Sequence, residues 1–358
     1  MRTFLLLILL LLLNACSDLG YYWHTANGHM TLMNNRVDID VMLEDPELEP
    51  KLRERLRLVK EIRDFSVETL SLPESDSYNN YVQLDRPYAL KNLFAATEFS
   101  TDLHVWCYPI VGCASYRGYY DEDRLAGYVE QLKAQNFDTY IGFVPAYSTL
   151  GWFDDPVLSS FIYWPDYRLA GLLFHELTHQ RIFIENDTRF NESLASAVQQ
   201  AGTELWLKSS NRSAQQAEFR RSIEYQREVV GLIEQTRETL TALYQGDQDE
   251  TIKRVQKQVI FANTRESYVA LAQRLNYRGG YESWFAGELN NAKLGSVSAY
   301  HEQLPAFLAI LKARNYDFSA FFDTVEGISE LEKAERDACL TLWSAGKLSG
   351  DENCALDS

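Results

Sequence analysis

One segment limits the fold more than any other, and it reads DYRLAGLLFHELTHQRIF over residues 166–183. Six apolar or small residues precede His175, and His179 follows four positions later. Residues four apart lie one turn apart on the same face of an α-helix, so both imidazoles can reach one metal ion at about 2.0–2.1 Å. The segment therefore predicts a buried helix from about Asp166 to Phe183 that carries a polar cluster on one side.

The five residues from His175 to His179 form the pattern HExxH. In this pattern Glu176 lies beside the ligand face, where a carboxylate can accept a proton from water without binding the metal itself. Only six histidines occur in the chain, so the pattern favours a metal site. The alternative is a solvated helix face whose histidines bind nothing.

A catalytic zinc ion usually has three protein ligands and leaves its fourth position open. The downstream candidates are Glu185, Asp187, Glu192 and Glu204. The first two fall in a turn, where they are expected to be solvated or to cap the next helix, and Glu204 lies three turns into that helix. We predict Glu192 as the third ligand, because a short connection returns the start of the second helix toward the first.

The N-terminus resembles a bacterial lipoprotein signal. Arg2 precedes an apolar run from Phe4 to Leu13, too short to span a bilayer, and Ala15 precedes Cys16. Residues 1–15 are expected to be removed and Cys16 to be acylated. Because Ser17 follows the cysteine, we expect a lipid-anchored protein of the cell envelope that faces the periplasm, with the outer membrane favoured. The alternative is an ordinary cleaved signal.

The composition excludes some partners. The chain has 34 Lys and Arg against 51 Asp and Glu, a formal charge of −17. Phosphate binding needs clustered basic side chains, so no nucleic acid partner is expected, and membrane attachment should come from the lipid. In an oxidising compartment the four remaining cysteines predict two disulfides, Cys107–Cys113 and Cys339–Cys354, with free buried thiols as the alternative.

Periodicity predicts an α+β, predominantly helical chain with a small strand region before the active-site helix. After signal removal we expect one lobed domain over 16–358, with strands in about 75–160 and helices in 161–358. The expected elements are a helix through Leu52–Phe65, a strand from Tyr140 to Tyr147, helices near Asn191–Lys208, Ala214–Gln245 and Asp249–Leu275, and a final helix from Leu304.

The two motifs together resemble the gluzincin layout, in which HExxH is followed by Asn-Glu-x-x-Ala, here NESLA. Twelve residues separate His179 from Glu192, fewer than in those enzymes, and Ser196 stands where an acid often follows the third ligand. The resemblance implies a zincin-like metallopeptidase that binds one Zn²⁺ through His175, His179 and Glu192.

Longer segments resemble a family of bacterial lipoproteins described as predicted zinc-dependent aminopeptidases. They are WCYPIVGCASYRGYYD, AYSTLGWFDDPVL, FHELTHQ, DTRFNESLA and YHEQLPAFLAIL, in this order. The resemblance implies a zinc-dependent aminopeptidase that acts on peptides.

The chemistry predicts further roles. Glu176 would be the general base, and Tyr300 and His301 are the candidates to donate a hydrogen bond to the oxyanion; the alternative for both, which is favoured, is packing or surface placement. Tyr147, Ser148 and Thr149 could form an edge strand that binds extended substrate, or an ordinary hairpin edge.

Two other functions stay open on the residues alone. One is a zinc endopeptidase or amidase that acts on envelope proteins or peptidoglycan stem peptides. The other is a non-catalytic lipoprotein with a structural zinc site, which would be closed by a fourth protein ligand. The residues predict neither a side-chain preference nor an oligomeric state.

Overall fold

The computed structural model describes residues 20–108, 112–146, 149, 153–277, 279–298 and 303–348, and it is predominantly helical. After a helix over residues 20–34, the helices are α2 (Ile39–Glu44), α3 (Pro50–Glu68), α4 (Glu122–Ala134), α5 (Asp166–Arg181), α6 (Thr188–Ser209), α7 (Ser213–Gln245), α8 (Glu250–Leu275), α9 (Glu282–Ala286), α10 (Asn291–Ser298), α11 (Leu304–Ala313), α12 (Phe318–Ser329) and α13 (Lys333–Ser344). The strands are β1 (Val37–Asp38), β2 (Asn80–Val82), β3 (Leu90–Thr97), β4 (Trp106–Tyr108), β5 (Gly112–Ala114), β6 (Arg117–Tyr119), β7 (Phe137–Val144) and β8 (Val157–Leu158).

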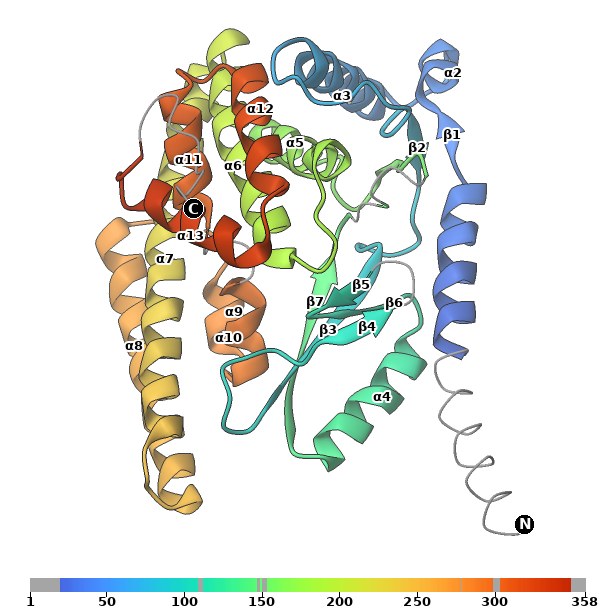
Figure 1. Ribbon diagram of the computed structural model, residues 1–358. Coiled ribbons are helices and arrows are strands. Elements are labelled where there is room, and N and C mark those ends of the chain that lie inside the picture. Colours follow the sequence, from blue (N-terminus) through green and yellow to red (C-terminus); the bar gives the residue numbers. More distant parts are fainter. Residues whose placement is uncertain are drawn as a thin grey trace, which may run out of the picture.

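The largest sheet has the order β6-β3-β7, with antiparallel pairing throughout. Side chains alternate between its faces, as the period of a strand requires. Leu93 and Ala95 of β3 pack with Leu125 and Val129 of α4, and Phe94 and Ala96 pack on the other face with Ala292 of α10. Both faces of this sheet are therefore covered by helices (Figure 1).

A second, smaller sheet joins the strand region to the helical region. Its order is β1-β2-β8, and β2 pairs in parallel with β8 through Tyr81 and Val157. Just before these strands, the hydroxyl of Ser77 accepts a hydrogen bond from the backbone N–H of Asp155 and another from the side chain of Gln180 on α5. This contact ties the segment before β8 to α5, the helix that carries His175 and His179.

Helices α5 and α6 pack closely inside the main hydrophobic core, with α11, α12 and α13 around them (Figure 1). A Cβ atom on Gly202 of α6 would lie 2.7 Å from Leu70 and 3.2 Å from Phe174. A Cβ on Gly171 of α5 would lie 3.0 Å from Thr203. Glycine at these two positions lets the backbones approach, which brings the side chains of the two helices together.

Helices α7 and α8 form a long hairpin with a hydrophobic cluster of its own. It extends downward at the left of Figure 1, and Lys257 of α8 pairs with Asp138 of β7 at 2.8 Å. Two neutral hydroxyl pairs join the helices, Tyr225–Tyr268 at 2.8 Å and Thr236–Thr264 at 3.0 Å.

Most of the expected helices are present with nearly the expected ends, but the order of elements is not strands followed by helices. The helix over 20–34, α2, α3 and α4 all precede α5, and α12 and α13 follow the helix that was expected to be last. Helix α4 had a readable pattern: Asp121 caps it, and Leu125, Val129 and Leu132 are buried at helical spacing. The expected strand Tyr140–Tyr147 begins earlier and ends at Val144.

Cys107 and Cys113 form a disulfide that joins the paired strands β4 and β5. Cys339 is also disulfide-bonded, whereas Cys354 and Cys16 lie outside the described residues. Within the described part of the chain, no helix combines the length and the apolar character needed to cross a membrane.

Candidate metal centre

Three side chains from two helices converge on one point. His175 and His179 extend from α5, and Glu192 extends from the second turn of α6. The Nε2 atom of His175 lies 3.2 Å from Oε2 of Glu192, and the Nε2 atom of His179 lies 3.8 Å from the same oxygen. The candidate ligand atoms all lie within 4.8 Å of one another.

These separations fit one small divalent cation. Four ligands at about 2.0–2.1 Å in tetrahedral geometry lie roughly 3.3–3.4 Å apart. The two measured separations fall on either side of that value, and the three donors are the nitrogen and oxygen atoms that zinc accepts. The residues present therefore fit the zinc ion that the sequence pattern predicts.

The outer nitrogen atoms of the two histidines differ. Nδ1 of His175 lies 3.1 Å from Oε1 of Gln199, which follows Glu192 by two turns on the same face of α6, so this amide orients the ring with Nε2 toward Glu192. Nδ1 of His179 is buried and has no hydrogen-bond partner among the described residues. Gln199 takes the place of the carboxylate that often orients a metal-binding histidine.

The connection between α5 and α6 fixes the position of Glu192. The side chain of Asn191 accepts from the backbone N–H of Ile184 and donates to the carbonyl of the same residue. Asp187 caps α6 through the N–H of Phe190 and pairs with Arg336 at 2.7 Å. The asparagine of the NES segment thus closes the turn, so the following glutamate faces the histidines.

The other acids considered as ligands are placed elsewhere. Asp187 is buried as a helix cap rather than solvated, and Glu204 pairs with Arg220 at 2.7 Å on the surface. The ligand group found in the described part of the chain contains neither of them, nor Glu185.

Burial controls the charges at the site. Burial raises the pKa of Glu176 to about 7, and the carboxylates of Glu192 and Asp155 add to the shift. Burial lowers the pKa of His179 to about 4, which favours the neutral imidazole that a metal ion requires. For Glu192, burial acts in the opposite direction, but the two histidines outweigh it and hold the pKa below its ordinary value.

Asp155 is a second buried acid beside the site, and the sequence analysis did not single it out. Its side chain is 2% exposed. Its Oδ2 accepts from the backbone N–H of Thr149 at 2.8 Å, and its Oδ1 has no hydrogen-bond partner within the described ranges. Burial raises the pKa of this carboxyl to about 6. The Gln180–Ser77 contact places Asp155 next to the C-terminal half of α5.

Tyr116 was also missed. It lies between β5 and β6, and its ring contacts Phe94 with a centroid distance of 6.0 Å. Burial raises the pKa of its phenol, and the charges of Glu192 and Glu176 raise it further, so the hydroxyl stays protonated close to the site. Tyr116 falls within the segment WCYPIVGCASYRGYYD, but no spacing there connects it with the histidines. It reaches the helices only because the sheet folds against them.

Of the residues predicted to donate to the oxyanion or to bind substrate, the structure describes only Thr149 apart from the metal-site residues. Tyr300, His301, Tyr147 and Ser148 lie outside the described residues. Thr149 is described, but it lies in a loop after β7 rather than in a strand, and its hydroxyl bonds with the backbone of Phe153.

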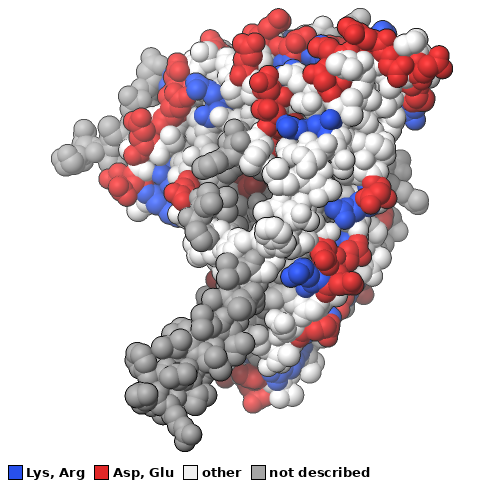
Figure 2. Space-filling model, turned by 90° about the vertical axis from the view of Figure 1, so that its right-hand side faces the viewer, with Lys and Arg blue, Asp and Glu red and all other residues white. Residues whose placement is uncertain are grey.

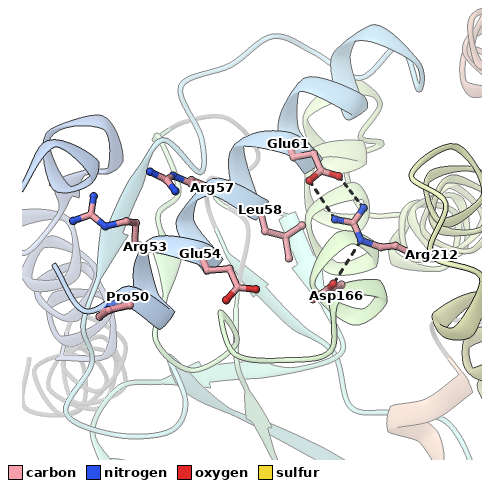
Figure 3. A pocket seen from close by; sticks show the side chains of 8 residues that line it. All are labelled: Pro50, Arg53, Glu54, Arg57, Leu58, Glu61, Asp166 and Arg212. Atoms are coloured by element: carbon pink, nitrogen blue, oxygen red, sulfur yellow. Dashed lines mark hydrogen bonds and ion pairs between the residues drawn. The ribbon is translucent and has the colours of Figure 1, made fainter.

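A separate hollow of about 500 Å³ lies between α3 and the start of α7 (Figure 3). It is lined by Pro50, Arg53, Glu54, Arg57, Leu58, Glu61, Asp166 and Arg212. Arg212 bonds with both oxygens of Glu61 and lies 3.6 Å from Asp166. This hollow shares no residue with the His-His-Glu group, and the charge of Arg212 is balanced within it.

The helix pair brings together two histidines and one carboxylate that could hold a metal ion, with a further carboxyl group beside them. The chain belongs to the family described as putative aminopeptidase, whose sequence model matches residues 20–340. Membership indicates a peptidase and hence peptide substrates. Comparison with curated proteins and with solved structures gave no match.

Proposed function

We propose that this protein is a zinc-dependent aminopeptidase of zincin-like fold, with His175, His179 and Glu192 as the metal ligands. One observation carries the proposal. Two paired helices bring a tetrahedral-type ligand set together with Glu176, a buried carboxyl group whose pKa is near 7. A structural zinc site would need a fourth protein ligand, and the described residues supply three.

Bound zinc would act as a Lewis acid that polarises the substrate carbonyl and makes water more acidic. Glu176 takes the proton from the attacking water and later returns it to the leaving amine. A pKa near 7 suits both steps, because the group can gain and lose a proton at neutral pH. The apolar surroundings of α5 keep bulk water away from this transfer.

Tyr116 is the oxyanion donor that we propose among the described residues. Its phenol is protonated at neutral pH and lies where it senses the charges of Glu176 and Glu192. A protonated hydroxyl beside the metal can donate a hydrogen bond to the carbonyl oxygen as negative charge develops there. Tyr300 and His301 remain alternative donors.

Asp155 supports an aminopeptidase over an endopeptidase. An aminopeptidase must bind the free α-ammonium group of its substrate, and a buried carboxylate is the natural partner for a cation in a site of low dielectric. One oxygen of Asp155 is held by Thr149, and the other is free of partners in the described part of the protein. The acid also lies close enough to Glu176 to raise its pKa. We assign Asp155 as the anchor of the substrate amine.

The strand β7 would hold the rest of the peptide. It forms an edge of the β6-β3-β7 sheet, and Ile141 and Phe143 are exposed on it. An extended peptide can add to such an edge through backbone hydrogen bonds. The chain passes from β7 directly into the segment that contains Thr149 and Asp155.

We further propose that the protein is anchored by an acyl group on Cys16 and faces the periplasm, on the outer membrane. The apolar run Phe4–Leu13 and the small residue before Cys16 support this proposal. The acidic composition supports an attachment that depends on lipid rather than on basic side chains.

The test combines metal analysis with matched peptides. We expect close to one zinc ion per chain by mass spectrometry, and hydrolysis of aminoacyl-coumarin amides but not of the same amides with an acetylated N-terminus. Cleavage of both forms at similar rates would indicate an endopeptidase and would overturn the role of Asp155. Folded protein that stays free of zinc after zinc is supplied would refute the hydrolase.

Glu176→Gln is the control for the catalytic step. We expect this variant to keep its zinc and to lose activity by about 10²–10⁴-fold or more, because it lacks a base but no ligand. Loss of zinc in this variant would contradict the role assigned to Glu176.

A further inference from the structure

The helix over residues 20–34 differs from the rest of the molecule in charge. No Asp, Glu, Lys or Arg occurs from Leu19 to Asn35, although 24% of the chain is charged. Surface helices of a soluble acidic protein normally present charged side chains to water. The composition therefore indicates that the outer face of this helix meets something other than bulk water.

The inner face of the helix is fixed against the protein. The guanidinium of Arg117 lies 3.9 Å from the ring centroid of Tyr21, and Leu32 is buried in the main core. Nε2 of His24 accepts a hydrogen bond from the backbone N–H of Tyr120 at 3.1 Å. These contacts hold both ends of the helix and so fix which of its side chains face outward.

Along that outer face, large aromatic and apolar side chains stand among the exposed small or neutral polar residues Ala26, Asn27, Thr31 and Asn34. Trp23 is 75% exposed and Met30 is 47% exposed, and their spacing of seven residues places them on one line of the helix. Tyr22 is 38% exposed on one flank. On the same flank His29 contacts the ring of Phe153 at 4.6 Å, and Phe153 is itself 47% exposed. We call Tyr22, Trp23, Met30 and Phe153 the aromatic face.

Figure 2 shows this side of the molecule. Uncharged surface crosses the middle of the view, while Asp and Glu gather at the top. The acids that follow the helix, Asp38, Asp40, Glu44 and Asp45, belong to the chain at and after β1. The chain is thus uncharged along the helix over 20–34 and acidic in the segment that follows it.

The chain outside the described residues indicates what covers the aromatic face. Cys16 precedes Gly20, the first described residue, by four positions, a separation of at most about 14 Å for any conformation of the chain. An acyl group at Cys16 would thus hold the helix at the bilayer surface. Trp, Tyr and Met are side chains that partition into the interface between headgroups and acyl chains.

We propose that the aromatic face of the helix over 20–34 lies against the lipid bilayer and fixes the orientation of the anchored protein. The inference rests on the proposed acylation of Cys16 and is independent of the peptidase chemistry. A zwitterionic bilayer suits this face, since neither the helix nor the surrounding acidic surface offers a basic patch for anionic lipid.

A second copy of the chain is the alternative partner for the aromatic face, but the area of this face is small for a protein interface. Four partly exposed side chains of this size offer on the order of a few hundred Å² per copy. A standard protein interface buries about 800 Å² per partner. A bilayer needs no matching shape, so a small apolar face beside an anchor is sufficient.

The test uses the full, acylated chain in phosphatidylcholine vesicles, with a bimane label on an introduced thiol. Met30→Cys is the probe, and Val255→Cys on α8, which is also exposed, is the matched control. Cys107, Cys113 and Cys339 are disulfide-bonded and Cys16 is acylated, so the introduced thiol is expected to be the reactive one.

We expect brominated acyl chains to reduce the fluorescence at position 30 by roughly half or more, and to leave position 255 unchanged, because interfacial helices insert only about 5–10 Å. Vesicle-bound protein with no quenching at position 30 would overturn the proposed contact while leaving the anchor intact. Disulfide-linked dimers through position 30 without quenching would assign the face to a second copy. Protein that does not bind vesicles would refute both the anchor and the contact.

Discussion

Two helix pairs of this protein, α5–α6 and α7–α8, share an antiparallel arrangement and differ in what they bury. Between α5 and α6 lie two histidines and two glutamates close to one another. Between α7 and α8 lie apolar side chains and two neutral hydroxyl pairs, and Arg274 and Glu228 pair at the surface. The buried Lys257 of α8 pairs outside this contact, with Asp138 of β7. The α7–α8 contact is thus a hydrophobic cluster in which each of these four hydroxyls has a partner.

The kind of polar group buried in each helix pair indicates where the proposed chemistry takes place. Where a buried polar group has a neutral partner, its charge state does not matter for folding. Where buried ionisable groups face each other, their pKa values separate, as those of Glu176 and His179 do. Such shifts are typical of functional sites, because catalysis needs groups that exchange protons near neutral pH. These shifts support the proposed site between α5 and α6, whereas we expect the α7–α8 contact to contribute mainly to stability.

The largest difference between the pairs should appear on removal of one carboxylate. We expect Glu192→Ala to lose nearly all bound zinc and all activity, since it deletes one of three ligands. Glu204→Ala, on the same helix but paired with Arg220 at the surface, should keep both. Mass spectrometry and peptide hydrolysis would measure the contrast, and full zinc occupancy in the Glu192 variant would move the third ligand elsewhere.

Asp155→Asn should stabilise the protein while it impairs function. Burial raises the pKa of Asp155 to about 6 in the folded state, against about 3.9 in an unfolded chain. The folded state binds this proton more tightly, so stability falls as the pH rises from 4 to 6 and stays lower above it. Ionised Asp155 thus costs about 1–3 kcal/mol at pH 7–8.

Asparagine cannot ionise and still accepts from the N–H of Thr149. In urea unfolding of metal-free protein, the free energy of unfolding of the variant should exceed that of the unchanged protein by about 1–3 kcal/mol at pH 8 and by little at pH 4. Asp154→Asn, at the exposed neighbouring position, is the control. A destabilised Asp155 variant at pH 8 would show that the carboxylate has a structural role instead.

The two pairs should respond in opposite directions to Gly→Ala. In α6, a Cβ at Gly202 would lie 2.7 Å from Leu70, so overpacking should destabilise the protein by about 1–2 kcal/mol. In α7, a Cβ at Gly231 meets no atom within 4 Å, and alanine should stabilise by about 0.5–1 kcal/mol. Thermal unfolding of both variants would measure this, and equal shifts would show that the α5–α6 contact is not close-packed.

The smallest effect is expected at the surface of the hairpin. Arg274 pairs with Glu228 at 2.7 Å, but both side chains are exposed. Arg274→Ala should change the free energy of unfolding by about 0.5 kcal/mol or less. A larger change in a denaturant titration would mean that surface ion pairs help to hold α7 against α8.

Local patterns were enough to predict much of the helical part. The periodicity of apolar residues gave α5, α6, α7 and α8 with ends within a few residues, because a helix is decided by neighbours three and four positions apart. The same patterns did not give the order of elements. Short strands such as β1, β4 and β8 carry too few residues for a period and exist only through their partners.

The sequence by itself determined the ligand face of α5, because the spacing of His175 and His179 leaves one helical arrangement that reaches a single ion. It also placed Glu192 one short turn away. Only the tertiary structure decided that Gln199 orients His175, and that Tyr116 and Asp155 lie beside Glu176. Tyr116 and Asp155 are distant from Glu176 in the chain, and no regular spacing connects them with it. They come close to the site only because the sheets and loops pack against α5 and α6.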